Sequence, residues 1–410
     1  RVLNMGGPPR WACRLGLPLA RQAVRRSRAV LAGSLLWAAQ LLGPCGGHMQ
    51  QGRAVAMAPA AEVLRWGIVG CGDVTEKKSG PGFQRAAHSM LQAVMRRHAE
   101  KASDYAKRHG VPSWHSSVDG LLHDTEVDAV YVATPPGSHL EVARQVAAAG
   151  KPCYMEKPLA RSFVESAEMV NAFARAGLPL FVAYYRRAYP RYQRLKALLD
   201  SGSLGELSAV HYTLRRPPQS AGWRQDVQVS GGGLFVDVGS HVLDLLDFLL
   251  GPLREVTGSA TRSPAATAAE PEDVVTASFL AGRGAVGTAS WNFRTFDSFE
   301  SLEIVGDHGR VVLPDPMNGA SCILEYADAS KNERWEVPPP SPAVQEPLIQ
   351  SVVDAIRSGD WSRCPSTGES ALRTAGYIDA ILGGFYAGRE DAFWERPQTW
   401  PVNAANGSSS

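Results

Sequence analysis

Short apolar runs alternate with stretches of helical periodicity in the first half of the chain, beyond residue 62. Five runs have the length of a buried strand: 63–69, 90–95, 127–134, 152–155 and 180–184. Apolar residues recur at helical spacing at 141–146 and 163–176. Strands that alternate with helices form a parallel sheet covered on both faces. The pattern therefore predicts a doubly wound α/β domain, which we place at residues 63–185.

The second half has a different pattern, with apolar and polar positions alternating every two residues. Six segments show it: 207–214, 254–261, 274–280, 285–293, 301–306 and 309–313. Helical periodicity appears at 188–200, 347–358 and 370–387. Strands that follow one another without helices between them pair antiparallel. We expect an α+β domain with a mostly antiparallel sheet at residues 186–395, followed by a tail at 396–410.

The 410 residues exceed what one hydrophobic core usually organises, which agrees with two domains. Residues 1–60 are rich in Arg and contain no acid, and they include an apolar run at 31–42. Such a segment is typical of a transit peptide to a plastid or mitochondrion, although a gene-model extension before Met57 is an equal alternative and a secretory signal a weaker one. We expect an organellar location if the segment is genuine and a cytoplasmic one otherwise.

Charge and cysteine content exclude several classes of protein. The net charge is +2, and no stripe of Lys and Arg interleaved with aromatic residues appears in the body of the chain, so nucleic acid is not an expected partner. The apolar run at 31–42 is shorter than the roughly 20 residues that span a bilayer. The six cysteines form no CxxC pair and no cluster with histidines, so no metal site is expected and a reducing compartment fits best.

A glycine turn follows the first predicted strand directly, in the sequence Gly70-Cys71-Gly72-Asp73-Val74-Thr75. In a dinucleotide-binding unit the first glycine permits a tight turn, and the second allows the backbone to approach the pyrophosphate at a helix N-terminus. Gly70 and Gly72 match these two positions, whereas Thr75 stands where a third glycine or alanine is usual. Taken alone, the turn could also be a purely structural strand-to-helix connection.

Two arginines follow the second predicted strand, where enzymes selective for NAD carry an acid. The guanidinium groups of Arg96 and Arg97 would form charge-assisted hydrogen bonds with the 2′-phosphate of NADP. The sequence therefore predicts a preference for NADP(H) over NAD(H). The alternative is that both arginines simply face solvent.

Other polar residues lie just past the ends of predicted strands, where ligands bind in parallel sheets. Together with the glycine turn, Ala133-Thr134-Pro135-Pro136 with His139, Glu156-Lys157-Pro158, and Gly231-Gly232-Gly233 leading to Asp237 and His241 resemble the Gfo/Idh/MocA family of oxidoreductases over about residues 63–395. The resemblance implies a dinucleotide-binding domain and a second domain whose open sheet covers the nicotinamide and carries contacts between subunits of a homo-oligomer, a dimer or tetramer.

The resemblance also implies roles for individual residues. It places the active-site lysine at Lys157 and its partners at Asp237 and His241. The cofactor contacts then fall on three segments of the chain: Gly70, Gly72, Asp73, Val74 and Thr75 at the turn, Arg96 and Arg97 after the second strand, and Thr134, Pro135, Pro136, His139, Glu156 and Lys157 after later strands.

Hydride transfer to or from a carbinol carbon leaves one proton to be moved by the protein. A lysine ammonium can donate and can stabilise a developing oxyanion, and a histidine titrates near neutrality. Asp237 and His241 are four residues apart, so on a helix they would share one face. We assign proton transfer to His241, with Lys157 as substrate clamp and co-acid, and the exchange of these two roles stays open.

Five further residues are candidates for the substrate pocket: Tyr185, Arg186 and Arg187 between the domains, and Trp223 and Arg224 before the triple glycine. Arginines suit hydroxyl or carboxylate groups, and Trp223 could stack on a sugar or belong to the core. The predicted function is an NADP(H)-dependent oxidoreductase of a sugar or polyol. Two alternatives are a dinucleotide-binding sensor without turnover, which Lys157 and His241 disfavour, and an NAD-dependent glycoside-cleaving enzyme, which Arg96 and Arg97 disfavour.

Overall fold

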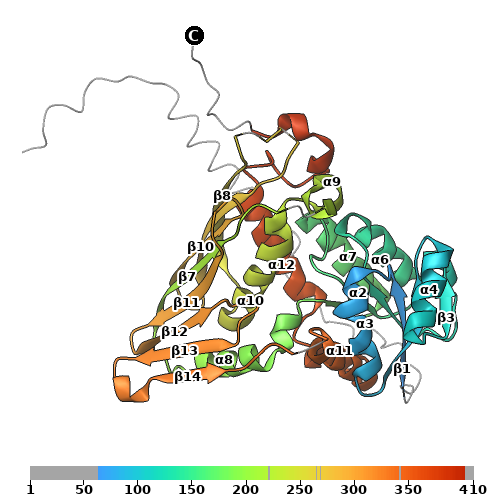
Figure 1. The fold of residues 1–410 in the computed structure, drawn as a ribbon, viewed down its shortest axis with the longest axis horizontal. Helices are drawn as coiled ribbons and strands as arrows, with labels where there is room; N and C mark the ends of the chain where they lie inside the picture. Colours follow the sequence, from blue (N-terminus) through green and yellow to red (C-terminus); the bar gives the residue numbers. More distant parts are fainter. Residues whose placement is uncertain (1–62, 220–221, 265, 268, 341–342, 402–410) are drawn as a thin grey trace, which may run out of the picture. The chain divides into compact units, whose positions relative to one another are not determined.

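The computed structural model describes residues 63–219, 222–264, 266–267, 269–340 and 343–401, and these residues form two sheets (Figure 1). The predicted targeting segment at 1–60 and most of the predicted C-terminal tail lie outside the described residues. None of the helices in the described part combines the length and the apolar character that a membrane span requires.

The first sheet has six parallel strands in the order β3-β2-β1-β4-β5-β6. Its strands are β1 (Leu64–Val69), β2 (Ser89–Met95), β3 (Ser113–His115), β4 (Ala129–Val132), β5 (Cys153–Met155) and β6 (Leu180–Val182). Its helices are α2 (Asp73–Lys77), α3 (Gly80–Arg85), α4 (Ala99–His109), α5 (Val118–Leu122), α6 (His139–Ala148) and α7 (Phe163–Ala176). This strand order is that of a Rossmann fold, with the order reversing between β1 and β4.

The second sheet has eight strands in the order β14-β13-β12-β11-β7-β10-β9-β8. Its strands are β7 (Leu207–Arg215), β8 (Arg254–Thr261), β9 (Val274–Ala281), β10 (Ala285–Asn292), β11 (Phe299–Gly306), β12 (Gly309–Pro314), β13 (Ser321–Tyr326) and β14 (Glu333–Glu336). All neighbours pair antiparallel except β7 and β10, which are parallel. A Rossmann sheet together with an open, mostly antiparallel sheet confirms the predicted fold class.

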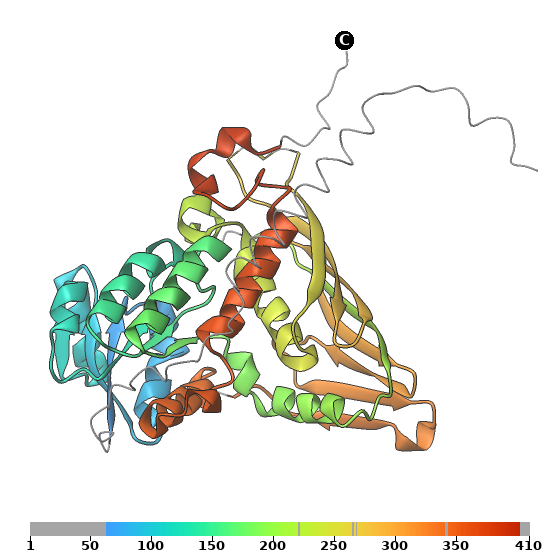
Figure 2. The same ribbon diagram turned by 180° about the vertical axis from the view of Figure 1, so that it is seen from behind.

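Helices cover one face of the second sheet, on the side of the parallel sheet (Figures 1 and 2). They are α8 (Pro190–Asp200), α10 (Ser240–Leu250) and α12 (Gly368–Leu382). Along β10 buried residues alternate with more exposed ones, as expected for a sheet with one packed face. One buried apolar cluster includes both Trp66 of β1 and Trp291 of β10, so the two sheets are joined through a continuous core.

The chain returns to the parallel sheet after β14. Helix α11 (Glu346–Ser358) packs beside α3, where Arg85 and Glu346 form an ion pair of 2.7 Å and Gln350 accepts a 2.7 Å hydrogen bond from the amide of Ala87. A further bridge joins Phe181 to Thr367 before α12 begins. Residues that follow the second sheet in sequence therefore pack against the first domain, at α3 and at the edge strand β6.

Candidate active site

A cavity of about 1080 Å³ lies beyond the carboxyl ends of β1, β4 and β5. Residues of both halves of the chain line it. They include Gly70, Gly72, Asp73, Val74, Arg96, Arg97, Thr134, Pro135, Pro136, Glu156, Lys157, Tyr185, Trp223, Arg224, Asp237 and His241, all of which the sequence had suggested as site residues. The cavity is large enough for a dinucleotide and occupies the usual ligand position of a doubly wound sheet.

The glycine turn brings the backbone of β1 close to that of β4. Gly70 has φ +90°, and a Cβ there would lie 2.6 Å from Cγ2 of Thr134, so only glycine fits without rearrangement. The amide of Gly72 donates to Oγ1 of Thr75 (2.9 Å), and that hydroxyl donates to the carbonyl of Gly72 (2.8 Å). Thr75 is fully buried, so its side chain stabilises the turn by these hydrogen bonds and does not face the cavity.

Three cations gather where β2 ends. Arg96 and Arg97 directly follow β2, and Lys101 lies on α4, one turn beyond Arg97. All three line the cavity, and their side chains make no hydrogen bond or ion pair with any described residue. This end of the cavity thus has positive charge that is not neutralised by the protein. Lys101 was missed in the sequence analysis, because helix α4, which carries it, was not predicted.

Lys157 and Asp237 meet from segments 80 residues apart. The Nζ of Lys157 donates to Oδ1 of Asp237 at 2.5 Å and to its backbone carbonyl at 3.1 Å. Arg224 donates to the other carboxylate oxygen at 3.0 Å. Burial alone would raise the pKa of Asp237, but the charges and hydrogen bonds of Lys157 and Arg224 outweigh it and leave that pKa below its ordinary value. Asp237 is therefore an anion that holds Lys157 in place.

His241 lies at the start of α10, after a π-helical turn at Phe235–Gly239 that contains Asp237. The side chain is buried between the rings of Tyr184 and Tyr185, whose centroids lie 6.0 and 5.3 Å from its own. Burial lowers the pKa of His241 well below its ordinary value, and nearby cations lower it further: Lys157, Arg186 and Lys78. The imidazole is therefore neutral near pH 7 and able to accept a proton.

Glu156 precedes Lys157 and is buried among neutral donors. Its Oε1 accepts hydrogen bonds of 2.6 Å from both the Tyr131 hydroxyl and the side-chain amide of Gln345, and its Oε2 accepts from the amide of Lys157 at 3.1 Å. Gln345 also accepts from the hydroxyl of Tyr154 (3.0 Å). Gln345 lies immediately before α11 and lines the cavity, but its place in the sequence, more than 180 residues after Glu156, offered no signal for it.

Two predicted cofactor residues, Thr75 and His139, lie outside the cavity lining. His139 is fully buried at the start of α6. Its ring nitrogens lie 2.7 Å from the carbonyl oxygen of Thr134 and 3.0 Å from that of Leu159. The imidazole thus connects the end of β4 to the loop that carries Lys157.

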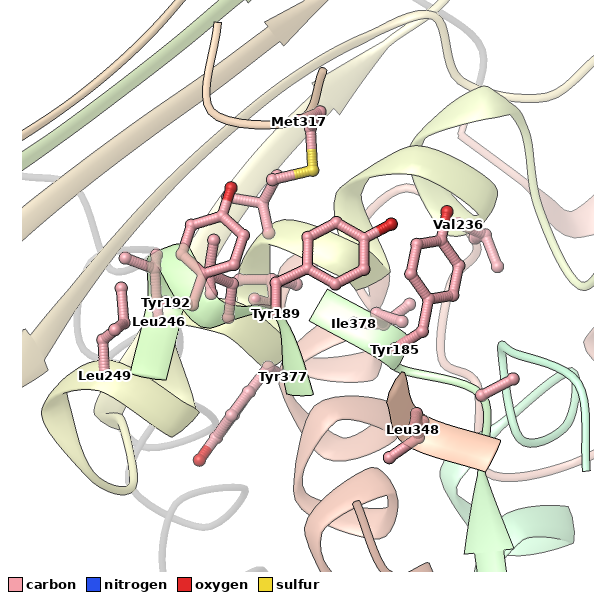
Figure 3. Close-up of a cluster of buried hydrophobic side chains, with 14 of the residues drawn as sticks. Tyr185, Tyr189, Tyr192, Val236, Leu246, Leu249, Met317, Leu348, Tyr377 and Ile378 are labelled. Carbon is pink, nitrogen blue, oxygen red and sulfur yellow. The ribbon is translucent and has the colours of Figure 1, made fainter. Parts of the chain in front are cut away.

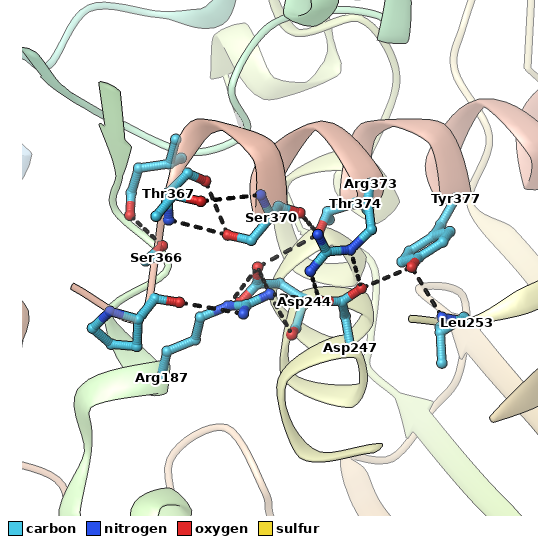
Figure 4. A network of polar contacts seen from close by, with 12 residues as sticks. Arg187, Asp244, Asp247, Leu253, Ser366, Thr367, Ser370, Arg373, Thr374 and Tyr377 are labelled. Carbon is cyan, nitrogen blue, oxygen red and sulfur yellow. Dashed lines mark hydrogen bonds and ion pairs between the residues drawn. The ribbon is translucent and has the colours of Figure 1, made fainter. Parts of the chain in front are cut away.

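Two predicted substrate residues also lie outside the lining, in the turn at Tyr185–Ala188. Arg187 is buried against α10, with its Nη2 2.9 Å from Asp244 and 3.0 Å from Asp247 (Figure 4). Arg373 of α12 pairs with Asp247 as well, at 2.7 Å. A buried ion network of this kind loses about 3–5 kcal/mol of stability when one partner is removed.

Arg186 is buried beside Tyr185. Tyr185 belongs to a row of tyrosines with Tyr189 and Tyr192 (Figure 3). The Nη2 of Arg186 donates to the carbonyl of Met317 at 3.1 Å, and its guanidinium lies 5.0 Å from the ring of Tyr185. Its Nε and Nη1 are buried without a hydrogen-bond partner among the described residues. Arg186 therefore lies behind the site and adds positive charge to the surroundings of His241.

The triple glycine allows the two catalytic segments to touch. Gly231 has φ +79°, and a Cβ there would lie 2.5 Å from the carbonyl oxygen of Arg161, four residues after Lys157. Arg389, which is buried, donates to the carbonyls of Gly231 and Arg161 at 2.7 Å each, and to Asp379 of α12 at the same distance. The loop of Lys157 and the loop that leads to Asp237 are thus joined by one guanidinium.

Metal and disulfide chemistry find no support in the described part of the chain. No group of three or more His, Cys, Asp or Glu there could hold a metal ion. The four described cysteines, Cys71, Cys153, Cys322 and Cys364, are buried free thiols.

Comparison with known proteins agrees with this architecture. Residues 64–184 match the model of an oxidoreductase family with an NAD-binding Rossmann fold, and residues 192–312 match the GFO/IDH/MocA C-terminal domain. The chain is 31% identical to Oxidoreductase P35 of Formosa agariphila over 76% of this chain and 96% of that protein. It is 27% identical to a dTDP-3,4-didehydro-2,6-dideoxy-alpha-D-glucose 3-reductase of Streptomyces violaceoruber, over 78% and 94% of the two chains.

A similar solved structure is KijD10, a 3-ketoreductase from Actinomadura kijaniata, in complex with NADP and TDP-benzene. It is 22% identical, has a TM-score of 0.67, and the match covers 78% of this chain and 97% of that one. Both halves of the fold, the cavity at the carboxyl ends of the strands and the two family matches lead to one conclusion. The chain belongs to the GFO/IDH/MocA family and is an NAD(P)-dependent oxidoreductase.

Proposed function

We propose that this enzyme transfers a hydride between NADP(H) and a hydroxyl-bearing carbon of a sugar or polyol. The observation that carries the proposal is the convergence of Lys157, Asp237 and His241 on the cavity that also contains the glycine turn. A reductase that acts on a dTDP-linked keto sugar is among the relatives, which supports a sugar-like substrate.

The residues present fit a dinucleotide with a 2′-phosphate. Gly70 and Gly72 form a turn without side chains, as close approach of a pyrophosphate requires. Arg96, Arg97 and Lys101 supply three cations for a phosphate dianion. When bound there, the dinucleotide supplies hydride transfer, and the chain's own groups must bind the substrate and move the proton.

In the oxidation direction the C–H bond breaks with its electron pair and the hydroxyl loses its proton. Lys157, held by Asp237, donates a hydrogen bond to the substrate oxygen and stabilises the negative charge that develops on it. His241 is the proposed proton acceptor, because burial and nearby cations lower its pKa and leave the neutral base form in place near pH 7. In reduction the same proton returns to the new alcohol. Tyr185, Trp223 and Arg224 line the cavity and are proposed to orient the rest of the substrate.

The cofactor preference is tested by measuring kcat/KM with NADPH and NADH for the wild type, Arg96→Asp, Arg97→Asp and Lys101→Asp. We expect the wild type to prefer NADPH and each variant to lose about 10-fold or more of that preference, since a charge-assisted contact becomes a repulsion. Lys107→Asp is the matched control, because Lys107 is an exposed lysine of α4 outside the cavity lining and the substitution changes the charge by the same amount as Lys101→Asp. A wild type that prefers NADH contradicts this assignment.

The reaction is tested by following nicotinamide absorbance with a panel of sugars, cyclitols and their oxo forms, using protein that begins near residue 57. Net oxidation or reduction is expected. Binding of NADPH without turnover would indicate a sensor, and release of sugar without net change in the cofactor would indicate a glycoside-cleaving enzyme.

A further inference from the structure

Four cations that line the cavity make no hydrogen bond or ion pair with the described residues. Three of them, Arg96, Arg97 and Lys101, lie together beyond β2 and suit the 2′-phosphate. The fourth is Lys78, which directly follows α2. It contributes to the lowered pKa of His241, so its ammonium lies within electrostatic range of the imidazole. Lys78 therefore belongs to the reacting end of the cavity, and the proposed reaction gives it no role.

The backbone around Lys78 is fixed to the same network that holds Glu156. The carbonyl of Lys78 accepts a hydrogen bond of 3.3 Å from the amide of Gln345, whose side chain contacts Glu156. The side chain of Lys78 itself is exposed on the cavity wall. The position of its backbone is thus determined, while its ammonium group is available to a ligand.

Apart from Arg96, Arg97 and Lys101, the cations that line the cavity pair with carboxylates, with the exception of Lys78. Lys157 and Arg224 both pair with Asp237, and Arg161 pairs with Glu165. Lys78 has no ion pair with a carboxylate among the described residues. Asp237 is shared by Lys157 and Arg224, and Glu156 is occupied by Tyr131 and Gln345, so neither carboxylate is available to Lys78.

A cation in a cleft that no carboxylate of the protein neutralises attracts and orients an anion. Building on the proposed function, we propose that the substrate is an anionic sugar, whose carboxylate or phosphate is bound by Lys78 beside the carbon that reacts. Arg186 contributes to the same field from behind Tyr185, without touching the ligand. A neutral sugar would leave Lys78 unpaired and would bind less tightly.

Lys77 offers a matched control for Lys78. It is the preceding residue, it is also exposed, and it is not part of the cavity lining. Lys77→Met and Lys78→Met therefore change net charge by the same amount on the same short helix end. Because both side chains are on the surface, both variants are expected to fold, which thermal unfolding can check.

The experiment measures binding by calorimetry to the enzyme saturated with NADP+. The probes are D-glucuronate with its neutral counterpart D-glucuronamide, and D-glucose 6-phosphate with D-glucose, which separates the two sources of negative charge. We expect the wild type and Lys77→Met to prefer one anionic probe by about 10-fold or more, as for a hydrogen bond between charged groups. Lys78→Met is expected to lose that preference, and the preference of the wild type is expected to weaken with added salt.

Three results would overturn the proposal. The first is a wild type that binds neither anionic probe more tightly than its neutral counterpart. The second is a Lys78→Met variant that retains the anionic preference. The third is a Lys78→Met variant that weakens binding of NADPH instead, which would assign Lys78 to the cofactor. Failure of the proposed function gives a different result, because the anionic preference would then be present without any change in nicotinamide absorbance.

Discussion

His241 is a histidine whose surroundings keep it neutral. It is buried against two tyrosine rings, and the nearby charges that act on it are cations. A group that must accept a proton is more useful when it is unprotonated at the working pH, at the cost of lower intrinsic basicity. The residue environment therefore favours His241 as the proton acceptor in oxidation.

This environment predicts the pH dependence of oxidation. The pKa of His241 lies well below 6.5, so the base form persists as the pH falls from 8 to 6.5, and kcat/KM for a neutral sugar should not decline through His241 in that range. Lys78→Met removes a cation that disfavours imidazolium. It should raise the pKa of His241 and move the acidic limb of the profile to higher pH, whereas Lys77→Met should not.

A wild-type profile that loses half of its kcat/KM near pH 6.5 would contradict the neutral histidine. A profile that Lys78→Met leaves unchanged would favour the exchanged roles, with Lys157 as the group that takes the proton.

The residues of the site could be predicted where motifs mark them and not where distant segments supply them. Lys157, Asp237 and His241 follow recognisable motifs and do line one cavity. Gln345 and Trp394 also line the cavity, but they belong to segments that follow the second sheet in sequence. No local sequence pattern indicates that these segments pack back against the first domain. Conversely, Arg187 is of a residue type that often binds ligands, but here its charge is neutralised by Asp244 and Asp247, two buried acids of α10.

At the scale of elements, the site depends on how two loops are held together. The loop after Lys157 and the loop after Gly231 contact each other through backbone atoms, and Arg389 donates to a carbonyl of each. Arg389 touches none of the residues assigned to chemistry. It is therefore a positioning residue, supplied by a segment beyond the two family matches.

Arg389→Met should separate the two loops slightly and lower kcat by about 10- to 100-fold, because small displacements of catalytic groups are costly. The dissociation constant of NADPH should change much less. Arg191→Met is the control, since Arg191 is also buried and also donates to two backbone carbonyls, those of Gly319 and Pro316 in the loop between β12 and β13. Stopped-flow turnover and thermal unfolding distinguish the two variants. Equal effects of both on kcat would mean that Arg389 acts only through stability.

Most elements followed from periodicity, and the exceptions have physical causes. Helix α4 was missed because it buries only Ala102, Tyr105 and Ala106 and is otherwise polar. Strands β13 and β14 lie at the sheet edge, where β14 buries Trp335 alone. The helix predicted to reach residue 387 ends at Leu382, before a glycine pair. The parallel pairing of β7 with β10 could not be predicted, because pairing order is decided by packing across the whole sheet.

At the scale of the whole molecule, the second sheet has one face without helices among the described residues (Figures 1 and 2). Val286, Ala209 and Val305 form an apolar row across β10, β7 and β11 on that face, and Val286 is 55% exposed. Stable association buries about 1,200–2,000 Å² in total, and a flat sheet face suits this. A homo-oligomer is therefore expected.

Light scattering coupled to gel filtration should give twice or four times the monomer mass for the wild type. Val286→Lys with Val305→Lys places like charges at both ends of the apolar row and should yield monomers that still bind NADPH. A wild type that is monomeric at micromolar concentration would contradict this expectation.

Lys157 and His241 are proposed to act on one substrate in one cavity. This is tested by comparing turnover of the best sugar substrate by the wild type, Lys157→Ala and His241→Ala, with circular dichroism and NADPH binding recorded for each. We expect both variants to stay folded, bind NADPH and lose about 100-fold or more in kcat, the usual contribution of positioned proton transfer. Near wild-type turnover in both folded variants would contradict it.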